Sequence, residues 1–283
     1  MDSAYYSTYD SFKMTDMDHP SIQKPVVLVL AGHDPSGGAG IQADIETLAA
    51  HDCIATSVIT SLTAQNTQSF SYHLPQTAED FVTQGKLVFE DIKIDACKIG
   101  AIGSPELIQA IHELIADQSF PVVLDPVLQS TTGHDFSNEE ICALLYDLLI
   151  PFATVITPNR DEVMQLTGEL KPQAAAERLL EMGCKNILIS DVEDSETKVI
   201  NYLFQEDGQC HTFTWERLPG NFHGSGCTLA SAITASLAKD IELISAVEQA
   251  QDFTWHSLKN GLHLGKGQIH PNRFFNQTEN KLP

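Results

Sequence analysis

The sequence LPGNFHGSGCTLAS, residues 218–231, joins a strand-like run to a helical pattern. The run Cys210–Trp215 precedes it, and Ala230 and Leu237 then fall on one face of a helix. The small residues Gly224–Cys227 open that helix and leave backbone N–H groups without intrahelical partners. These donors and the positive end of the helix dipole attract anions. The stretch therefore predicts a strand, a turn that binds phosphate, and a helix.

Cys227 lies in the first turn of the predicted helix, where the dipole is expected to lower the pKa of a thiol. A base beside an anion site suits transfer of a phosphoryl group to a hydroxyl, because positioning and charge supply most of that catalysis. The alternative is a structural glycine turn followed by a small buried cysteine. We expect catalytic roles for four residues if the rest of the chain supports a kinase: Gly224, Ser225, Gly226 and Cys227.

Strand-like and helical segments alternate outward from this stretch. The apolar run Val26–Ala31 is typical of a strand buried on both faces of a parallel sheet. Further strands are predicted over residues 55–60, 95–100, 122–125, 153–157, 186–190, 198–204 and 210–215. Helices are predicted after residue 40 and over residues 77–91, 105–117, 139–149, 159–167, 172–182 and 243–260. Residues 61–74 are expected to form a polar loop. The alternation predicts an α/β fold, with a mostly parallel central sheet flanked by helices on both faces.

Residues 1–24 have no periodic apolar pattern and are expected to be a flexible N-terminal extension. We expect residues 25–283 to form a single domain, since no linker or repeat interrupts them. The acidic start is unlike a secretory signal. No apolar run approaches the length of a membrane span.

The chain of 283 residues carries 16 basic and 38 acidic side chains, a net charge of −22. This field repels DNA and RNA, so nucleic acid is excluded as a partner and a small-molecule enzyme is favoured. Six cysteines are scattered without a C-x-x-C pair, which argues against a zinc ribbon or a disulfide framework. We therefore expect a reduced, cytoplasmic protein.

Polar residues follow several predicted strands, where ligands bind in open α/β sheets. Asp125 could be a metal carboxylate, or only a turn-forming residue before Pro126. Asn159 and Glu162 have the spacing of a helix-capping box, and they could equally face a magnesium–phosphate group. Residue types alone leave these alternatives open.

Six segments, in order along the chain, carry a family resemblance: AGHDPSGGAGIQADIETL, TSLTAQNTQSF, DACKIGAIGS, VVLDPVL, ITPNRDEV and LPGNFHGSGCTLAS. Together they closely resemble the hydroxymethylpyrimidine/phosphomethylpyrimidine kinases of thiamine biosynthesis, from about Val26 to beyond Lys266. The resemblance implies a ribokinase-like fold, a homodimer, and the use of ATP and Mg²⁺. It also implies phosphorylation of 4-amino-5-hydroxymethyl-2-methylpyrimidine, and then of its monophosphate to the diphosphate.

The same resemblance implies roles for residues on the substrate side. Cys227 stands where the family keeps its base, and Gly224–Cys227 would form the anion hole for the transferred group. Gln65 would pair with the aminopyrimidine edge, for which an amide has the needed donor and acceptor. Asp44 and Gly32 would line the same pocket.

On the nucleotide side, Asn159 and Glu162 match an N-x-x-E motif near Mg²⁺ and the phosphates. Asp125 lies nearby, so Asp125 and Glu162 are the implied metal ligands. The acids within Asp191–Asp194 depart from the family and would repel a phosphate unless they point away.

Two alternatives to the pyrimidine kinase follow. A pyridoxal or pyridoxine kinase of vitamin B6 salvage could share the scaffold, because both substrates are methylated heteroaromatic alcohols. A pyrimidine-binding module without catalysis is the other, and the stretch Asp191–Asp194 motivates it. Gln65 favours the aminopyrimidine, and an intact Cys227 favours catalysis.

Overall fold

The computed structural model describes residues 24–129, 138–193 and 195–277. Apart from Lys24, the expected N-terminal extension lies outside the described residues, so its flexibility stays a prediction. The boundaries of a single domain at residues 25 and 283 stay a prediction as well. Asp194 also lies outside the described residues.

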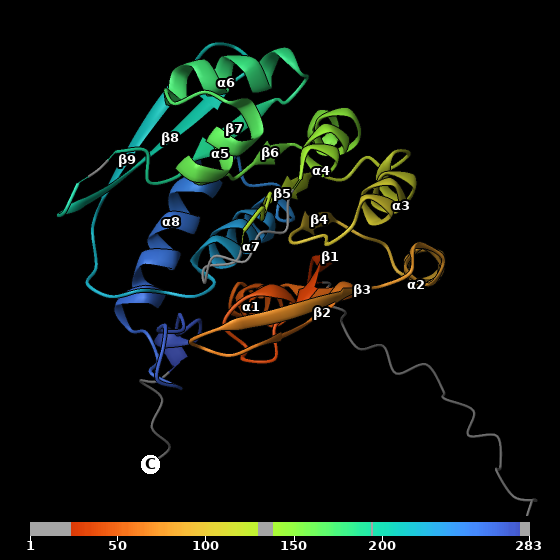
Figure 1. The fold of residues 1–283 in the computed structure, drawn as a ribbon, viewed down its shortest axis with the longest axis horizontal. Coiled ribbons are helices and arrows are strands. Elements are labelled where there is room, and N and C mark those ends of the chain that lie inside the picture. Colours follow the sequence, from red (N-terminus) through yellow and green to blue (C-terminus); the bar gives the residue numbers. More distant parts are fainter. Residues whose placement is uncertain (1–23, 130–137, 194, 278–283) are drawn as a thin grey trace, which may run out of the picture.

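Nine strands occur in the described residues: β1 (Val26–His33), β2 (Ile54–Gln65), β3 (Phe70–Pro75), β4 (Ala96–Ile99), β5 (Val122–Leu124), β6 (Val155–Ile156), β7 (Asn186–Ile189), β8 (Lys198–Gln205) and β9 (Cys210–Glu216). They form one sheet in the order β3-β2-β1-β4-β5-β6-β7-β8-β9 (Figure 1). Strands β2, β1, β4, β5, β6 and β7 run parallel, whereas β3, β8 and β9 are antiparallel to their neighbours. The predicted mostly parallel sheet is confirmed.

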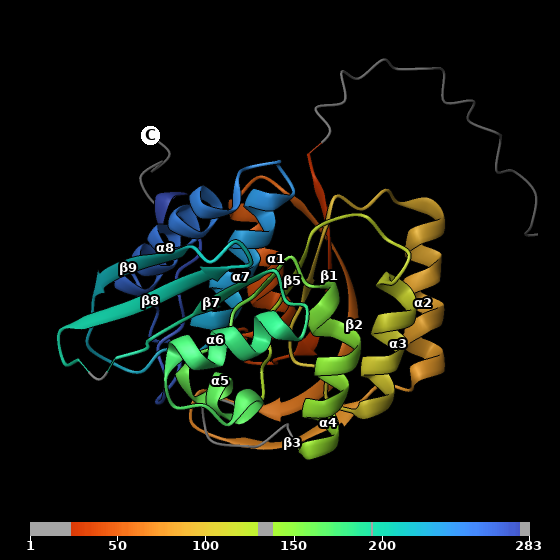
Figure 2. The same ribbon diagram turned by 90° about the horizontal axis from the view of Figure 1, so that it is seen from above.

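Helices cover both faces of the sheet (Figure 2). One layer consists of α1 (Gly40–Ala50), α7 (Ser225–Leu237) and α8 (Leu243–Lys259). The other consists of α2 (Ala78–Asp91), α3 (Pro105–Ile115), α4 (Glu139–Leu144), α5 (Arg160–Thr167) and α6 (Pro172–Glu181). Short helical turns are η1 (Leu145–Leu149), η2 (Ile150–Phe152) and η3 (Phe275–Gln277). In the part of the chain that the structure describes, no helix has the length and apolar character needed to cross a membrane.

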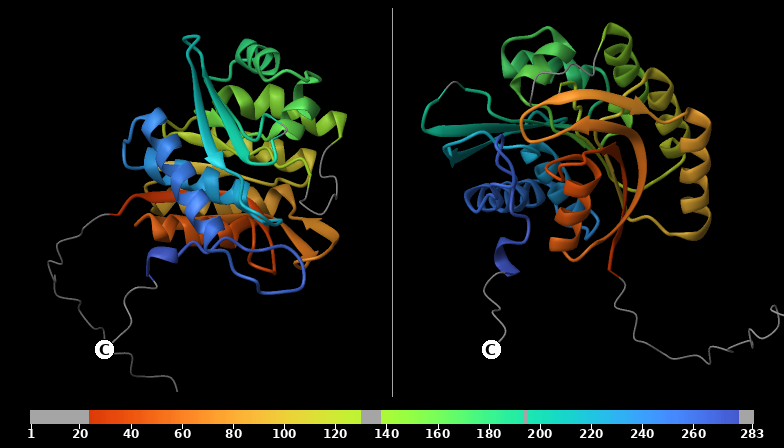
Figure 3. Two further views of the ribbon diagram at one scale, coloured as in Figure 1. Left: turned by 90° about the vertical axis from the view of Figure 1, so that its left-hand side faces the viewer. Right: turned by 60° about the horizontal axis from the view of Figure 1, so that its bottom comes forward.

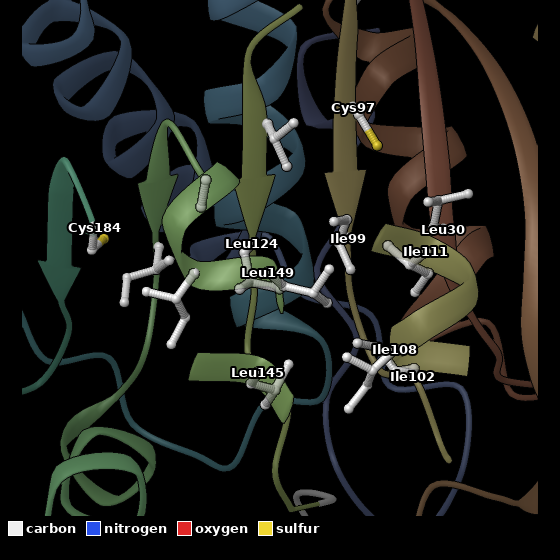
Figure 4. Packing of buried hydrophobic residues seen from close by; sticks show 14 of the residues in the cluster. Leu30, Cys97, Ile99, Ile102, Ile108, Ile111, Leu124, Leu145, Leu149 and Cys184 are labelled. Atoms are coloured by element: carbon white, nitrogen blue, oxygen red, sulfur yellow. The ribbon is translucent and has the colours of Figure 1, made fainter. Parts of the chain in front are cut away.

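Helix α3 shows why these sequences form these layers. Ser104 caps its first turn by accepting a hydrogen bond from a backbone N–H, and Pro105 occupies a position that needs no donor. Ile108 and Ile111 fall on one face of the helix and are fully buried. Figure 4 shows them beside Ile99 of β4. Burying one such side chain stabilises the fold by about 1.5–3 kcal/mol, so the apolar stripe fixes the helix on the sheet.

The predicted polar loop over residues 61–74 is wrong. Strand β2 continues to Gln65, and β3 pairs with it antiparallel, with Leu62 opposite Leu74. Ser61, Thr63 and Gln65 point toward a cavity, which is why their polar character resembled a loop. Alternation of a cavity face with an exposed face replaced the usual alternation of core and solvent.

Candidate active site

A cavity of about 420 Å³ lies at the carboxyl ends of the parallel strands. Backbone hydrogen bonds bring the strand ends together: Gly100 N donates to Leu30 O over 2.8 Å, and Asp125 N donates to Ile99 O over 2.8 Å. Nine of the predicted site residues line this cavity: Gly32, Gln65, Asp125, Asn159, Glu162, Gly224, Ser225, Gly226 and Cys227. The tenth, Asp44, does not.

The predicted anion cradle, residues Gly224–Cys227, begins helix α7 on the cavity wall. Gly224 is the N-cap residue and has a φ of +89°. A Cβ at this position would lie 1.8 Å from Gly38 O, so only glycine allows the two backbones to approach this closely. The first N–H groups of α7 have no intrahelical acceptors and are available to an anion.

The predicted low pKa of Cys227 is wrong for the protein without ligands. Burial and the nearby carboxylates of Asp125 and Asp44 raise the pKa of this thiol to about 12, although Lys98 acts to lower it. Desolvation and two carboxylates outweigh the helix dipole here. In the unloaded protein Cys227 is therefore a thiol.

Lys98 is the functional candidate that sequence reasoning missed. Its side chain is fully buried on β4, and it lines the cavity. Nζ lies 2.9 Å from Asp44 Oδ1 and 4.0 Å from Asp125 Oδ2. Burial alone would lower the pKa of Lys98, but the carboxylates of Asp44 and Asp125 raise it, so the lysine stays charged. The available signal was a lysine inside an otherwise apolar strand, DACKIG.

The prediction that Asp44 lines the pocket is wrong. Its carboxylate is fully buried behind the cavity wall, where Oδ1 accepts a hydrogen bond of 2.7 Å from Ser231 Oγ. Asp44 balances the charge of Lys98, because a buried ammonium without a partner would be very costly. Its contact with the site runs through that lysine.

Asp125 and Glu162 form a pair of buried carboxylates at the cavity. Burial raises the pKa of Asp125 to about 6, and burial together with the charge of Asp125 raises that of Glu162 to about 8. Asp125 Oδ2 and Thr157 Oγ1 are buried without hydrogen-bond partners. Such oxygens suit a hard cation such as Mg²⁺. No cluster of three or more His, Cys, Asp or Glu ligands occurs in the described residues, so phosphate or water oxygens would complete its coordination.

Asn159 takes the structural role that the sequence left open. Its side chain accepts hydrogen bonds of 2.9 Å from the backbone N–H groups of Asp161 and Glu162. Glu162 Oε2 in turn accepts from Asn159 N over 2.8 Å, which completes a capping box. The box holds the Glu162 carboxylate at the cavity, and any contact of Asn159 with Mg²⁺ or phosphate stays a prediction.

The acids at Asp191 and Glu193 do not remain as free charges. Asp191 forms an ion pair with Arg217, with Oδ1 2.5 Å and Oδ2 3.2 Å from the guanidinium nitrogens. Glu193 accepts a hydrogen bond of 3.0 Å from the hydroxyl of Tyr202. The repulsion expected from these two acids is therefore reduced by partners that the sequence did not indicate.

A histidine–carboxylate contact joins two walls of the cavity. His223 Nε2, next to the cradle, lies 2.8 Å from Oδ2 of Asp34, which belongs to the loop between β1 and α1. Asp34 also accepts hydrogen bonds from the backbone N–H groups of Ser36 and Ala39. Burial alone would raise the pKa of Asp34, but His223 and these N–H groups lower it to about 2.

The Asp34 carboxylate should therefore stabilise the folded state at neutral pH. A pKa of about 2 in the folded protein, against 3.8 in the unfolded chain, corresponds to about 2 kcal/mol. We expect Asp34→Asn to lower the free energy of unfolding at pH 7 by up to about this amount. Since the folded pKa is the lower one, the difference should shrink as the pH falls from about 4 toward 2. Urea unfolding of both proteins at pH 7, 5 and 3 measures it, and a difference that grows in acid would contradict the assignment.

The mostly parallel sheet, with its cavity at the carboxyl ends of the strands, has the ribokinase-like arrangement. It defines the class of enzymes that phosphorylate a small alcohol. The sequence model of the family described as phosphomethylpyrimidine kinase matches residues 34–272. The chain belongs to this family, and the predicted family, fold and kinase class are confirmed.

Individual relatives agree with the family. A hydroxymethylpyrimidine/phosphomethylpyrimidine kinase of Haemophilus influenzae is 36% identical over 252 residues, which cover 85% of this chain and 93% of that protein. A crystal structure of phosphomethylpyrimidine kinase from Clostridium difficile has a TM-score of 0.71 and 33% identity, covering 82% of this chain and 98% of that one. Pyridoxal kinase from Staphylococcus aureus, in complex with AMP-PCP and pyridoxal, has a TM-score of 0.80 and 27% identity, covering 90% and 95%.

Proposed function

We propose that this protein uses ATP and Mg²⁺ to phosphorylate 4-amino-5-hydroxymethyl-2-methylpyrimidine, and then converts the monophosphate to the diphosphate. The observation that carries the proposal is one cavity lined by both Gln65 and the anion cradle Gly224–Cys227. The names of the curated relatives support the substrate, and the AMP-PCP complex of the pyridoxal kinase supports the nucleotide.

Gln65 is proposed to orient the pyrimidine. It lies at the end of β2, half-buried, and its Nε2 donates a hydrogen bond of 2.8 Å to Thr63 Oγ1. That bond fixes one amide hydrogen, so the other hydrogen and the carbonyl oxygen can face a ring nitrogen and an amino group. Gly32, on the neighbouring strand β1, also lines the cavity, and a Cβ there would crowd Ser61 Oγ at 3.0 Å.

Cys227 is proposed to accept the proton of the substrate hydroxyl while the hydroxyl oxygen bonds to the γ-phosphorus and ADP leaves. The cradle N–H groups would hold the equatorial oxygens of the transferred group. Positive charge bound at Asp125 would offset one carboxylate that raises the thiol pKa, while Lys98 continues to lower it. The thiolate would then form more readily in the loaded enzyme than in the free one.

Asp125 and Glu162 are proposed to hold Mg²⁺ together with phosphate oxygens. When bound, the cation neutralises charge on the phosphates. Both carboxylates have raised pKa values, as expected where two acids share one buried site without a cation. Few basic side chains line the cavity, and the chain has a net charge of −22. A bound Mg²⁺ is therefore needed to offset the charge of the phosphates.

Trp215 and Trp255 are proposed to contact the nucleotide base. Both line the cavity, with ring centroids 6.5 Å apart. Hydrogen bonds hold the indoles: Trp215 donates to Gln251 Oε1 over 3.1 Å, and Trp255 donates to Glu216 O over 2.9 Å. Fixed aromatic faces suit stacking with a purine.

A pyridoxal kinase is the second candidate, favoured by the close structural match to the Staphylococcus aureus enzyme. The test is ADP release by purified protein with ATP and Mg²⁺, comparing kcat/KM for the hydroxymethylpyrimidine, its monophosphate and pyridoxal. We expect turnover of both pyrimidines. Activity on pyridoxal alone would move the protein to vitamin B6 salvage. Pyrimidine binding without any turnover would favour the binding module.

We also propose a cytoplasmic homodimer, as the family resemblance implies. All six cysteines are free thiols, as expected in a reducing compartment. The β2–β3 hairpin is drawn in orange in Figure 3. It exposes Leu62, Tyr72 and Leu74, an apolar face suited to a second copy of the chain. Light scattering should give twice the chain mass of 31.0 kDa, and a mass of one chain would exclude the dimer.

A further inference from the structure

The C-terminal segment Gly265–Arg273 contacts three separate walls of the cavity, and we name it the strap. It runs beside the tip of the β2–β3 hairpin (Figure 1), and its hydrogen bonds then reach the residues before the cradle and the loop between β1 and α1. These walls carry Gln65, the anion cradle and Gly32. The three must be placed correctly relative to one another for phosphoryl transfer. None of the strap's own residues lines the cavity.

The strap first holds the hairpin through Thr67, two residues beyond Gln65. Gln268 N donates to Thr67 O over 2.8 Å, and Gly267 N donates to Thr67 Oγ1 over 3.2 Å. A Cβ on Gly267 would lie 1.8 Å from Thr67 O, so the contact requires glycine. This contact anchors the hairpin two residues from Gln65.

The strap next pairs with the approach to the cradle. Ile269 N donates to Asn221 O over 2.8 Å, and His223 N donates to Ile269 O over 3.0 Å. This short ladder fixes the backbone directly before Gly224. It also places His223, whose ring contacts Asp34 across the gap between two walls.

Arg273 ends the strap with a buried guanidinium that joins the remaining walls. Nε donates to Thr228 Oγ1 over 3.0 Å, and that hydroxyl donates to Gly224 O over 2.8 Å. The two terminal nitrogens donate to Gly37 O and Gly38 O. Glu46 balances the charge, with Oε2 3.0 Å from the guanidinium. One side chain thus fixes the cradle relative to the loop against which Gly224 packs.

We propose that the strap is a positioning device for phosphoryl transfer, with Arg273 setting the cradle and Gly267 setting the Gln65 hairpin. A buried arginine is costly unless its donors are satisfied, and here its partners belong to two walls of the site. A misplacement of about 1 Å can reduce a rate by about 10²-fold, so these contacts act on catalysis without touching substrate. This inference rests on the proposed function.

The test measures kcat and KM separately for two strap variants and a control from the same loop. Arg273→Met should lower kcat by about 10-fold to 10²-fold, with the KM for the pyrimidine within about 3-fold of wild type. Gly267→Ala should instead raise the KM for the pyrimidine about 10-fold, with kcat nearly unchanged, because it displaces the Gln65 hairpin. Leu264→Ala, an exposed side chain just before the strap, should change neither.

Equal changes of kcat and KM in both strap variants, or changes in melting temperature alone, would overturn the proposal. If Arg273→Met does not fold, Arg273→Lys, which keeps the charge but loses the planar fork of donors, should show the same selective loss of kcat. Hydrogen exchange gives a readout independent of activity: Arg273→Met should speed exchange in residues 222–228, and Gly267→Ala in residues 64–69. A wild type without pyrimidine turnover would reject the proposed function, whereas unchanged exchange in both segments would reject the strap.

Discussion

Replacing Cys227 with alanine should lower kcat for the hydroxymethylpyrimidine by about 10²-fold to 10⁴-fold, the usual contribution of a general base. The thiol lies in the first turn of α7 and lines the cavity, with Lys98 and Asp125 as charged neighbours. Alanine removes the proton acceptor and leaves the cradle backbone in place. The KM for ATP should therefore change by less than about 3-fold. ADP release at saturating substrate measures the loss.

Cys210→Ala is the matched control, because this exposed thiol on β9 does not line the cavity. It should retain wild-type kcat, which separates loss of the base from general sensitivity to cysteine replacement. Cys227→Ser should fall between wild type and alanine, since its hydroxyl keeps a hydrogen-bonding group but not an easily ionised one. A Cys227→Ala enzyme with more than half the wild-type kcat would contradict the assignment of the base.

Replacing Glu162 with glutamine should weaken Mg²⁺-dependent turnover by about 10²-fold in kcat/KM, because it removes one of two proposed metal carboxylates. Glutamine can still accept the hydrogen bond from Asn159 N, so the capping box and α5 should persist. The rates are measured across a Mg²⁺ titration at several pH values. The variant should need more Mg²⁺ for half its maximal rate.

The pH dependence gives the same assignment a second test. The pKa of Glu162 is raised to about 8, and a cation must displace the proton. The apparent affinity of wild type for Mg²⁺ should therefore increase as the pH rises from 6 to 8, and the increase should be smaller in Glu162→Gln. Asp161→Asn, on the neighbouring exposed position of the same helix turn, serves as control and should behave as wild type. A pH-independent Mg²⁺ requirement in wild type would contradict the carboxylate site.

Local patterns predicted the alternating architecture because each element carries its own period. The buried run of β1 and the apolar stripe of α3 need no partner to be recognised. The β2–β3 hairpin was missed because its inward face meets a cavity rather than a core, so residues such as Thr63 remain polar. Recognising these residues as a strand requires knowledge of the cavity, which exists only in the folded protein.

The candidate site divides in the same way. Local patterns predicted the cradle before a helix, Asp125 after a strand and the Asn159–Glu162 capping box, whereas the role of Gln65 was expected from the family resemblance. The state of the Cys227 thiol could not be predicted, because it depends on burial and on Asp125 and Asp44, far away in sequence. Lys98, Arg217 and Arg273 are likewise defined by long-range ion pairs, for which the sequence carries no spacing rule.

The most direct test of the account is mass spectrometry of 4-amino-5-hydroxymethyl-2-methylpyrimidine after incubation with the protein, ATP and Mg²⁺. The account predicts a product heavier by one phosphoryl group that is then replaced by one heavier by two, with both products formed at least about 10²-fold more slowly by Cys227→Ala. Unmodified pyrimidine, under conditions in which pyridoxal gains a phosphoryl group, would contradict it.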